Sequence, residues 1–189
     1  MNTKNNRTFR NTQKIIRQIL LELLEIHDLR QITVTDICKK ARINRSTFYA
    51  HYLDIYDLME KTEDELNHKL LDLYKDSGAD NNNFFSSKYI AIFLRYVSQY
   101  RNFYRNFIQN RKSFPIEEGF QDLWYTMKLY YQNLGLMSED EMMYHFVYFQ
   151  AGFTMVLKRW LDRDCKESPE EMADTLVRCF KGSLEMTQH

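Results

Sequence analysis

The sequence predicts an all-α protein of about nine helices, arranged as a small three-helix head followed by a larger helical body. Two observations carry this fold class. Only five Gly and two Pro occur among 189 residues, while 44% of the residues are hydrophobic, so helix breakers are scarce. Apolar residues also recur at helical spacing, and no segment shows the alternation expected of a strand.

Residues 11–27 are expected to form the first helix. Two adjacent apolar rows run along it at i, i+4 spacing: Ile15, Ile19 and Leu23, and Ile16, Leu20 and Leu24. This stripe is wide enough to cover a pair of short helices. Lys14 and Arg17 lie off the stripe, where they are expected to be free to approach a nucleic-acid backbone.

Residues 33–52 are expected to form two short helices joined by a three-residue turn. Thr33 is a capping residue for the first, with Asp36 completing a weak capping box, and Asn44 is a strong capping type for the second. The inward positions are Ile37, Cys38, Ala41, Ile43, Phe48 and Tyr52. The outward positions are Arg45, Ser46, Thr47 and Tyr49. Hydrogen-bond donors projected from a docked short helix are what a helix-turn-helix needs to read a major groove.

Six further helices are expected beyond this pair. The fourth begins after Asp54 and runs to about Lys75, and the polar stretch 76–83 follows it as a loop. The later helices are expected over 86–100, over 102–110, from Ile116 to Asn133, after Ser138 and after Ser168. The last two have clear starts, because Ser138 with Glu141 is a capping box and Ser168-Pro169-Glu170-Glu171 combines a cap, a first-turn proline and a glutamate.

Charge is distributed unevenly along the chain, although its net value is zero. Residues 1–52 carry ten Lys or Arg against four Asp or Glu, which gives +6, and the remaining residues carry 16 against 22, which gives −6. A basic head on an acidic body suits a protein whose N-terminal end meets phosphates, while the rest repels them.

Several other classes of protein find little support. The three Cys share no CxxC spacing, so a disulfide framework and a structural zinc site are poor interpretations, and a reduced cytoplasmic protein is expected. The polar N-terminal residues give no signal peptide, and the longest uncharged run, 142–157, is shorter than the roughly 20 residues of a membrane span. No catalytic or metal-binding motif occurs, so neither an enzyme nor a cofactor is expected.

The segment from Ile32 to Tyr52, ITVTDICKKARINRSTFYAHY, resembles the TetR (tetracycline-repressor) family of transcriptional regulators. Its most specific part is STFYAHY at 46–52, an aromatic pair that flanks a histidine. The likeness is strongest over about 10–60, and the helix count extends it to the whole chain. The resemblance implies that a double-stranded DNA operator is contacted by Thr33, Thr35, Asn44, Arg45, Ser46, Thr47, Tyr49 and His51.

Two positions depart from the pattern of this family. Arg42 stands where the turn usually contains Gly, so the turn either accepts a non-Gly residue or is slightly altered. Ile55 replaces a Lys that is common early in the fourth helix, which removes one expected phosphate contact.

The C-terminal body is rich in aromatic residues, with 22 Phe, Tyr and Trp among the 106 positions from Phe84 onward. Such a body can enclose a small hydrophobic or aromatic effector, although an aromatic stripe at helical spacing also suits a plain core. The candidate ligand-binding residues are Phe93, Tyr96, Tyr100, Phe103, Tyr104, Trp124, Met127, Tyr131, His145 and Phe149.

A homodimer is expected, since paired recognition helices must reach successive major grooves about 34 Å apart. The resemblance implies that the last two helices pack against their mates as a four-helix bundle, with Ala151 and Gly152 at the closest point. The candidate interface residues are Met143, Val147, Gln150, Ala151, Thr154, Met172, Leu176, Cys179 and Phe180.

These observations predict a ligand-responsive homodimeric repressor. It would comprise a DNA-binding domain at 1–53, a connecting helix at 54–75 and a regulatory and dimerisation domain at 76–189. A regulator that acts through a protein partner is the alternative. Residues 101–104 and Trp160 resemble a TetR subgroup that includes regulators of dihydroxyacetone kinase genes, and at least one of its members acts with a protein partner.

Overall fold

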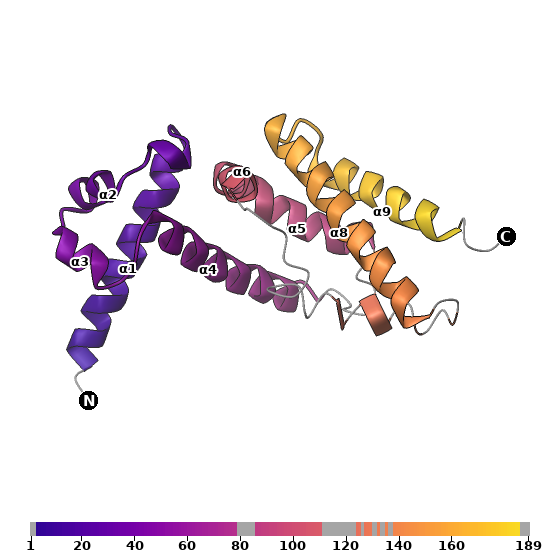
Figure 1. Cartoon of the computed structure of the whole chain (residues 1–189), viewed down its shortest axis with the longest axis horizontal. Helices are drawn as coiled ribbons and strands as arrows, with labels where there is room; N and C mark the ends of the chain where they lie inside the picture. The colour runs from indigo at the N-terminus through magenta and orange to yellow at the C-terminus, as the bar shows by residue number, and fades with distance from the viewer. Residues whose placement is uncertain are drawn as a thin grey trace. The chain divides into compact units, whose positions relative to one another are not determined.

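A computed structural model of the chain describes residues 3–78, 86–110, 124–125, 127–129, 132, 135 and 138–185, and every element defined within these ranges is helical (Figure 1). The all-α prediction is therefore confirmed. In chain order the elements are α1 (Thr3–Leu24), the short 3-10 helix η1 (Leu29–Gln31), α2 (Val34–Ala41), α3 (Arg45–Tyr49), α4 (Ile55–Asp76), α5 (Ser87–Gln99), α6 (Arg101–Asn110), α8 (Glu139–Asp162) and α9 (Pro169–Glu185).

Helix α1 differs most from its prediction, because it begins at Thr3 rather than near residue 11 and ends at Leu24. Its first turns carry no apolar row, so hydrophobic periodicity could not reveal them. No breaker precedes residue 11, and the Phe9 ring packs on the ring of His51. The helix can therefore continue towards the N-terminus beyond its apolar rows.

The predicted helix starts at Thr33, Ser138 and Ser168 are confirmed by their hydrogen bonds. At Thr33, the hydroxyl accepts from the Asp36 amide (3.2 Å), and the Asp36 carboxylate accepts from the Thr33 amide (2.9 Å). Ser138 makes the same reciprocal pair with Glu141. Ser168 does so with Glu171. Two otherwise orphan amides are satisfied at each start, so each helix begins where its cap stands.

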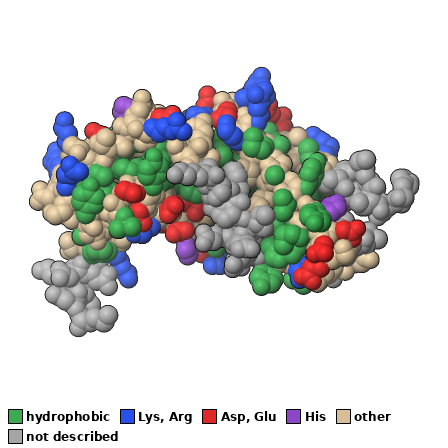
Figure 2. Space-filling model, in the orientation of Figure 1, with side chains coloured by type: hydrophobic (Ala, Val, Ile, Leu, Met, Phe, Trp, Pro, Cys, Tyr) green, Lys and Arg blue, Asp and Glu red, His purple; other side chains and the backbone are tan. Residues whose placement is uncertain are grey.

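The chain forms two compact units, each described here by itself. The first comprises Met1–Ser77 together with Asn102–Gln109, and the second comprises Gly78–Arg101 and Asn110–His189. In Figure 2 several cationic side chains lie together over the first unit, at the left of the view. The predicted domain limits at residues 53 and 75 stay predictions.

The core of the first unit joins α1 to the helices that follow it. Ile16, Leu20, Ile37, Phe48 and Leu58 are all fully buried. They come from α1, α2, α3 and α4, so the three-helix head and the start of the fourth helix share one apolar centre.

Helix α6 contributes polar contacts to this same unit. The buried Asn106 accepts a hydrogen bond from the Leu29 amide at 2.9 Å, which satisfies the first amide of η1. Asn102 donates to the Glu25 carboxylate at 2.8 Å. Because these contacts link positions 77 residues apart, α6 belongs physically with α1 and η1.

The second unit is built on α5, α8 and α9, with α5 and α9 in extensive contact. Trp160 is 1% exposed, and its indole N–H donates to the Glu167 carbonyl at 2.9 Å, which fixes the turn between α8 and α9. Arg95 of α5 pairs with Glu170 of α9 at 2.6 Å. Most of the predicted helix from Ile116 to Asn133 lies outside the described residues. None of the described helices is long and apolar enough to cross a membrane.

The turn between α2 and α3 keeps its shape without a glycine. Arg42 adopts φ 55° and ψ 44°, the left-handed conformation that Gly takes easily, and the Ile43 amide donates to the Cys38 carbonyl at 3.1 Å. This bond closes a Schellman-type helix end. The turn therefore accepts Arg42, at the cost of backbone strain of about 1 kcal/mol.

We expect Arg42→Gly to raise the free energy of unfolding by up to about 1 kcal/mol, because it removes the left-handed strain and its larger unfolded-state entropy offsets only part of the gain. Urea denaturation measures the change. Arg42→Ala is the control, since alanine loses the same side chain but keeps the strain. An equal change in both variants would contradict the explanation.

Candidate nucleic-acid interface

The candidate interface is centred on α3, which is only five residues long. Phe48 and Tyr52 hold it in place, with exposed fractions of 0% and 1%. Arg45 and Ser46 are exposed, Tyr49 is 49% exposed and Thr47 is half-buried. The structure thus brings the predicted base-contacting and phosphate-contacting side chains of α3 onto its outward surface.

Arg45 and Tyr49 are paired one helical turn apart. The Arg45 guanidinium donates to the Tyr49 hydroxyl at 3.3 Å and lies 5.9 Å from the centroid of its ring. The hydrogen bond holds the pKa of Arg45 above its usual range, so the side chain is a permanent cation. A fork of donors held beside a phenol can approach a guanine edge or a phosphate.

Thr33 at the start of α2 and Asn44 at the start of α3 differ in whether their side chains are already hydrogen-bonded. Thr33 is exposed, but its hydroxyl donates to the Asp36 carboxylate at 2.6 Å, so that proton is already used within the capping box. Asn44 occupies the N-cap position of α3 without a side-chain cap hydrogen bond. Asn44, Thr35 and Ser46 make no side-chain hydrogen bond to any residue that the structure describes, so their polar groups are open to a partner.

His51 lies just after α3, with its ring packed on Phe9 of α1 at a centroid separation of 3.9 Å. Its Nδ1 atom is buried without a hydrogen-bond partner, and burial lowers the pKa of the imidazole. The side chain as a whole is half-buried, so part of the ring can still meet a partner. This geometry suits a contact to a phosphate oxygen.

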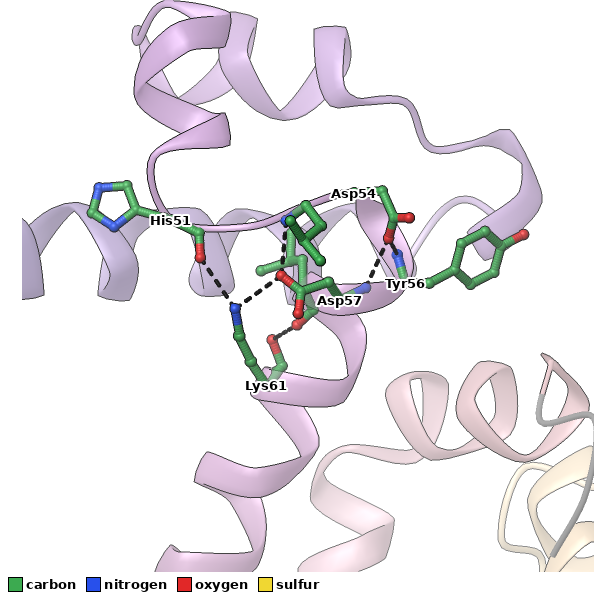
Figure 3. Close-up of polar contacts among 8 residues, drawn as sticks. His51, Asp54, Tyr56, Asp57 and Lys61 are labelled. Carbon is green, nitrogen blue, oxygen red and sulfur yellow. Dashed lines mark hydrogen bonds and ion pairs between the residues drawn. The ribbon is translucent and has the colours of Figure 1, made fainter.

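A polar network fixes the turn between α3 and α4 (Figure 3). The Lys61 ammonium donates to the His51 carbonyl at 3.3 Å and to the Asp57 carboxylate at 2.9 Å. Asp57 also accepts from the Leu53 amide at 2.8 Å, and Asp54 caps α4 by accepting from the Tyr56 and Asp57 amides. Lys61 therefore ties the segment that follows α3 to the first turns of α4.

The pKa of Asp57 reports the balance within this network. Burial raises the pKa, but the Leu53 hydrogen bond and the Lys61 ammonium outweigh it, so the pKa lies below its usual value. Because folding lowers the pKa of Asp57, the ionised carboxylate stabilises the folded protein at pH values above the ordinary carboxyl pKa. This contribution to folding stability is lost as the pH falls through the lowered pKa of Asp57.

The structure shows what happens at three positions near this surface where the sequence raised the question of a cation. Ile55 is buried, so the residue that replaces the common Lys is part of the core of the first unit. Arg17 forms an ion pair with Glu65 of α4, so the expectation that it is free to approach a backbone is wrong. Its partner lies 48 residues away and could not be foreseen from α1 alone. Lys14 is exposed and has no partner among the described residues.

The predicted ligand-binding residues are divided between the two units. Phe103 and Tyr104 of α6 are buried in the first unit. In the second unit, Tyr96 and Met127 are buried, whereas Phe93, Tyr100, Trp124, His145 and Phe149 are half-buried. Tyr131 lies outside the described residues. Aromatic rings pack on one another within this second set, as in the pairs Trp124–Phe146 and Phe93–Phe153.

The predicted dimer residues fall into three levels of exposure. Ala151 and Cys179 are exposed, and Met143 and Val147 are half-buried. Buried within the second unit are Gln150, Thr154, Met172, Leu176 and Phe180. The exposed large side chains of α8 are instead Tyr144, Tyr148 and Met155, at 74%, 70% and 59%. With Ala151 they follow i, i+4, i+7, i+11 spacing, so they share one face.

A groove of about 270 Å³ lies on the second unit, near the turn between α8 and α9. It contains none of the predicted ligand-binding residues. It is lined by Met155, Val156, Arg159, Trp160, Arg163, Glu167 and Met172. No group of three or more His, Cys, Asp or Glu within the described ranges is placed to hold a metal.

Sequence comparison decides the family. Residues 85–182, more than half of the chain, match the profile TetR_C_8, described as a transcriptional regulator C-terminal region. The chain belongs to the TetR family of transcriptional regulators. The helix-turn-helix near the N-terminus first suggested this family, and the match to the C-terminal region confirms it.

Individual relatives agree with this assignment to the TetR family. The uncharacterized HTH-type transcriptional regulator YxbF of Bacillus subtilis (strain 168) is 25% identical over 166 residues, which cover 84% of this chain but only 42% of that protein. The fold is similar to that of the dihydroxyacetone kinase operon activator DhaS, at 19% identity and a TM-score of 0.57, with 93% and 97% of the two chains covered.

Two fatty acid regulators share the fold as well. FadR from Bacillus halodurans, a fatty acid degradation regulator, gives a TM-score of 0.68 at 12% identity, with 92% and 96% of the chains covered. The Thermus thermophilus repressor FadR, solved in complex with lauroyl-CoA, gives 0.58 at 13% identity, with 89% and 92% covered.

In this TetR-family chain, sequence reasoning missed the roles of Phe9, Lys61 and the exposed face of α8. Phe9 lies where no apolar row marks the helix, and Lys61 acts through a backbone carbonyl that no motif encodes. The α8 face did carry a signal, because Tyr144, Tyr148 and Met155 are large apolar residues at helical spacing.

We expect Lys61→Met to weaken DNA binding without changing its salt dependence, because Lys61 positions the end of α3 through the His51 carbonyl. The free energy of unfolding should fall by at most about 1 kcal/mol, as for other partly exposed ion pairs. Fluorescence anisotropy with a labelled duplex at several salt concentrations measures both effects.

Lys61→Arg is the matched control, since it keeps a cation that can reach the same carbonyl and carboxylate. A fall of about 0.9 in the salt slope would instead mean that Lys61 itself contacts a phosphate. That outcome would contradict the positioning role.

Proposed function

We propose that this protein is a homodimeric, ligand-responsive repressor that binds an operator through α3. The observation that carries the proposal is the outward surface of α3, where Arg45, Ser46, Thr47 and Tyr49 project from a helix anchored by the buried Phe48. His51 and Thr35 supply further donors on either side. A cation and several donors on one docked helix match direct readout of a major groove.

The exposed face of α8 supports a dimer. Tyr144, Tyr148, Ala151 and Met155 lie on one side of the helix, and a Cβ at Gly152 would meet nothing within 4 Å. Contiguous exposed apolar side chains are typical of interaction sites. A second copy of α8 offers the same self-complementary surface, as a two-fold interface requires.

The interior of the second unit supports a small-molecule input. Gln150 is 5% exposed, and its side-chain amide nitrogen is buried without a hydrogen-bond partner. An unsatisfied buried donor is costly, and a ligand oxygen would satisfy it. To weaken operator binding a hundredfold, the effector must favour the non-binding state by about 2.7 kcal/mol. The lauroyl-CoA complex of Thermus thermophilus FadR makes a fatty-acyl thioester a reasonable first probe.

Regulation through a protein partner is the second candidate. The similarity to DhaS, which is an operon activator, favours considering activation as well as repression. The exposed α8 face would then receive a partner of another kind, and no effector would be needed.

Binding to the DNA upstream of this protein's own gene tests the proposal. We expect a discrete complex with two protomers per site, seen by gel shift and analytical ultracentrifugation, whose affinity falls steeply with salt. Arg45→Ala combined with Tyr49→Phe should lower the affinity by about tenfold to a hundredfold, since a base contact and a phosphate contact are lost together.

Arg178→Ala combined with Tyr125→Phe is the matched control, because both side chains are exposed in the second unit. Wild-type affinity in the α3 double variant would refute the assigned interface. Failure of the wild-type protein to bind any duplex would refute operator binding itself.

A thermal-shift screen with planar hydrophobic compounds and lauroyl-CoA tests the effector. At a hundred times its dissociation constant, a bound compound stabilises the folded state by about 2.7 kcal/mol, which raises Tm by several degrees. Gln150→Leu should reduce the shift because it removes the buried donor. If no compound in the panel raises Tm, the protein-partner alternative is favoured.

A further inference from the structure

Residues 7–15 of α1 have no buried side chain. Each of these side chains is exposed or half-buried, and Ile16 follows them as a fully buried residue. Figure 1 shows these turns continuing past α3. Helices of this length without tertiary packing are marginal in water, so this stretch gains little from the core of its own unit.

The charge of this stretch is of one sign. Residues 1–21 contain five Lys or Arg and no Asp or Glu. Arg17 is neutralised by Glu65, but Arg7, Arg10 and Lys14 are exposed and form no ion pair with any described residue. All three cations are therefore available to an external anion such as a phosphate.

Arg7, Arg10 and Lys14 share one side of the helix. Their i, i+3, i+7 spacing brings them into a single row, which spans about 10 Å at 1.5 Å per residue. Three cations in one row can face neighbouring phosphates of one strand, and each phosphate that they neutralise adds a salt-dependent contact.

Phe9 connects this row to the recognition surface. Its ring lies 3.9 Å from that of His51, measured between centroids, although Phe9 itself is 44% exposed. The contact holds the charged turns beside the end of α3. A duplex seated on α3 and touched by His51 would therefore continue past the row of cations.

We infer that residues 7–14 of α1 form a second DNA-contacting element, which binds the phosphate backbone beside the base pairs read by α3. Arg7, Arg10 and Lys14 supply the contacts, and Phe9 positions them. This inference rests on the proposed operator binding and adds a surface to it. The element contributes affinity that is independent of base sequence, because it meets phosphates rather than base edges.

The triple variant Arg7→Gln, Arg10→Gln, Lys14→Gln tests the inference. Each lost phosphate contact should make the fall of log K with log salt shallower by about 0.9, which gives about 2.7 per protomer for three contacts. The affinity for DNA near 0.1 M salt should fall at least about tenfold. Glutamine keeps a helix propensity close to that of Arg and Lys, and circular dichroism verifies the fold.

Duplex length gives an independent readout. A duplex trimmed to the base pairs covered by α3 should weaken binding by the wild-type protein, but should leave binding by the triple variant unchanged. The same trimming effect in both proteins would overturn the inference.

Lys88→Gln, Lys166→Gln, Arg178→Gln is the charge-matched control, because these exposed residues belong to the second unit. It should retain the wild-type salt slope. The inference would be overturned if the α1 variant kept the wild-type salt slope, or if the control variant lost as much salt slope as the α1 variant. Either result would leave operator binding intact. Failure of the wild-type protein to bind any duplex would overturn both proposals.

Discussion

The candidate DNA interface depends on the burial of Phe48. A five-residue helix cannot hold its own shape in water, because the cost of forming its first turn is not recovered over so short a length. Phe48 has no exposed surface, and Tyr52 one turn later is almost as buried. These two side chains set which face of α3 points outward, so the positions of Arg45 and Tyr49 follow from them.

Residues distant in sequence then hold this small helix in its place. Lys61 fixes the carbonyl of His51 from one side, while Phe9 covers the ring of His51 from another. In the same unit, the side chain of Asn106 accepts a hydrogen bond from the Leu29 amide, which lies 77 residues earlier in the chain. The position of α3 therefore depends on contacts from α1 and α4, while α6 holds η1 of the same unit.

Local patterns made much of the fold predictable. The capping boxes at Thr33, Ser138 and Ser168 involve residues three apart, so each helix start could be read directly. Inward and outward positions in α3 followed from helical spacing. The start of α1 could not be predicted in this way, because its first turns carry no apolar row and Phe9 packs instead on His51, which is distant in sequence.

The sequence by itself determined the helical class, the starts of α2, α8 and α9, the helix-turn-helix and the excess of cations in the head, since each is encoded by residue types or by spacings of three to four residues. Tertiary structure alone decided which of those cations are free. It paired Arg17 with Glu65 and left Lys14 exposed. It also placed α6 with the N-terminal unit and turned Tyr144 and Tyr148, rather than Gln150, towards the surface. These outcomes depend on which distant residues come into contact, and no spacing within a single helix specifies that choice.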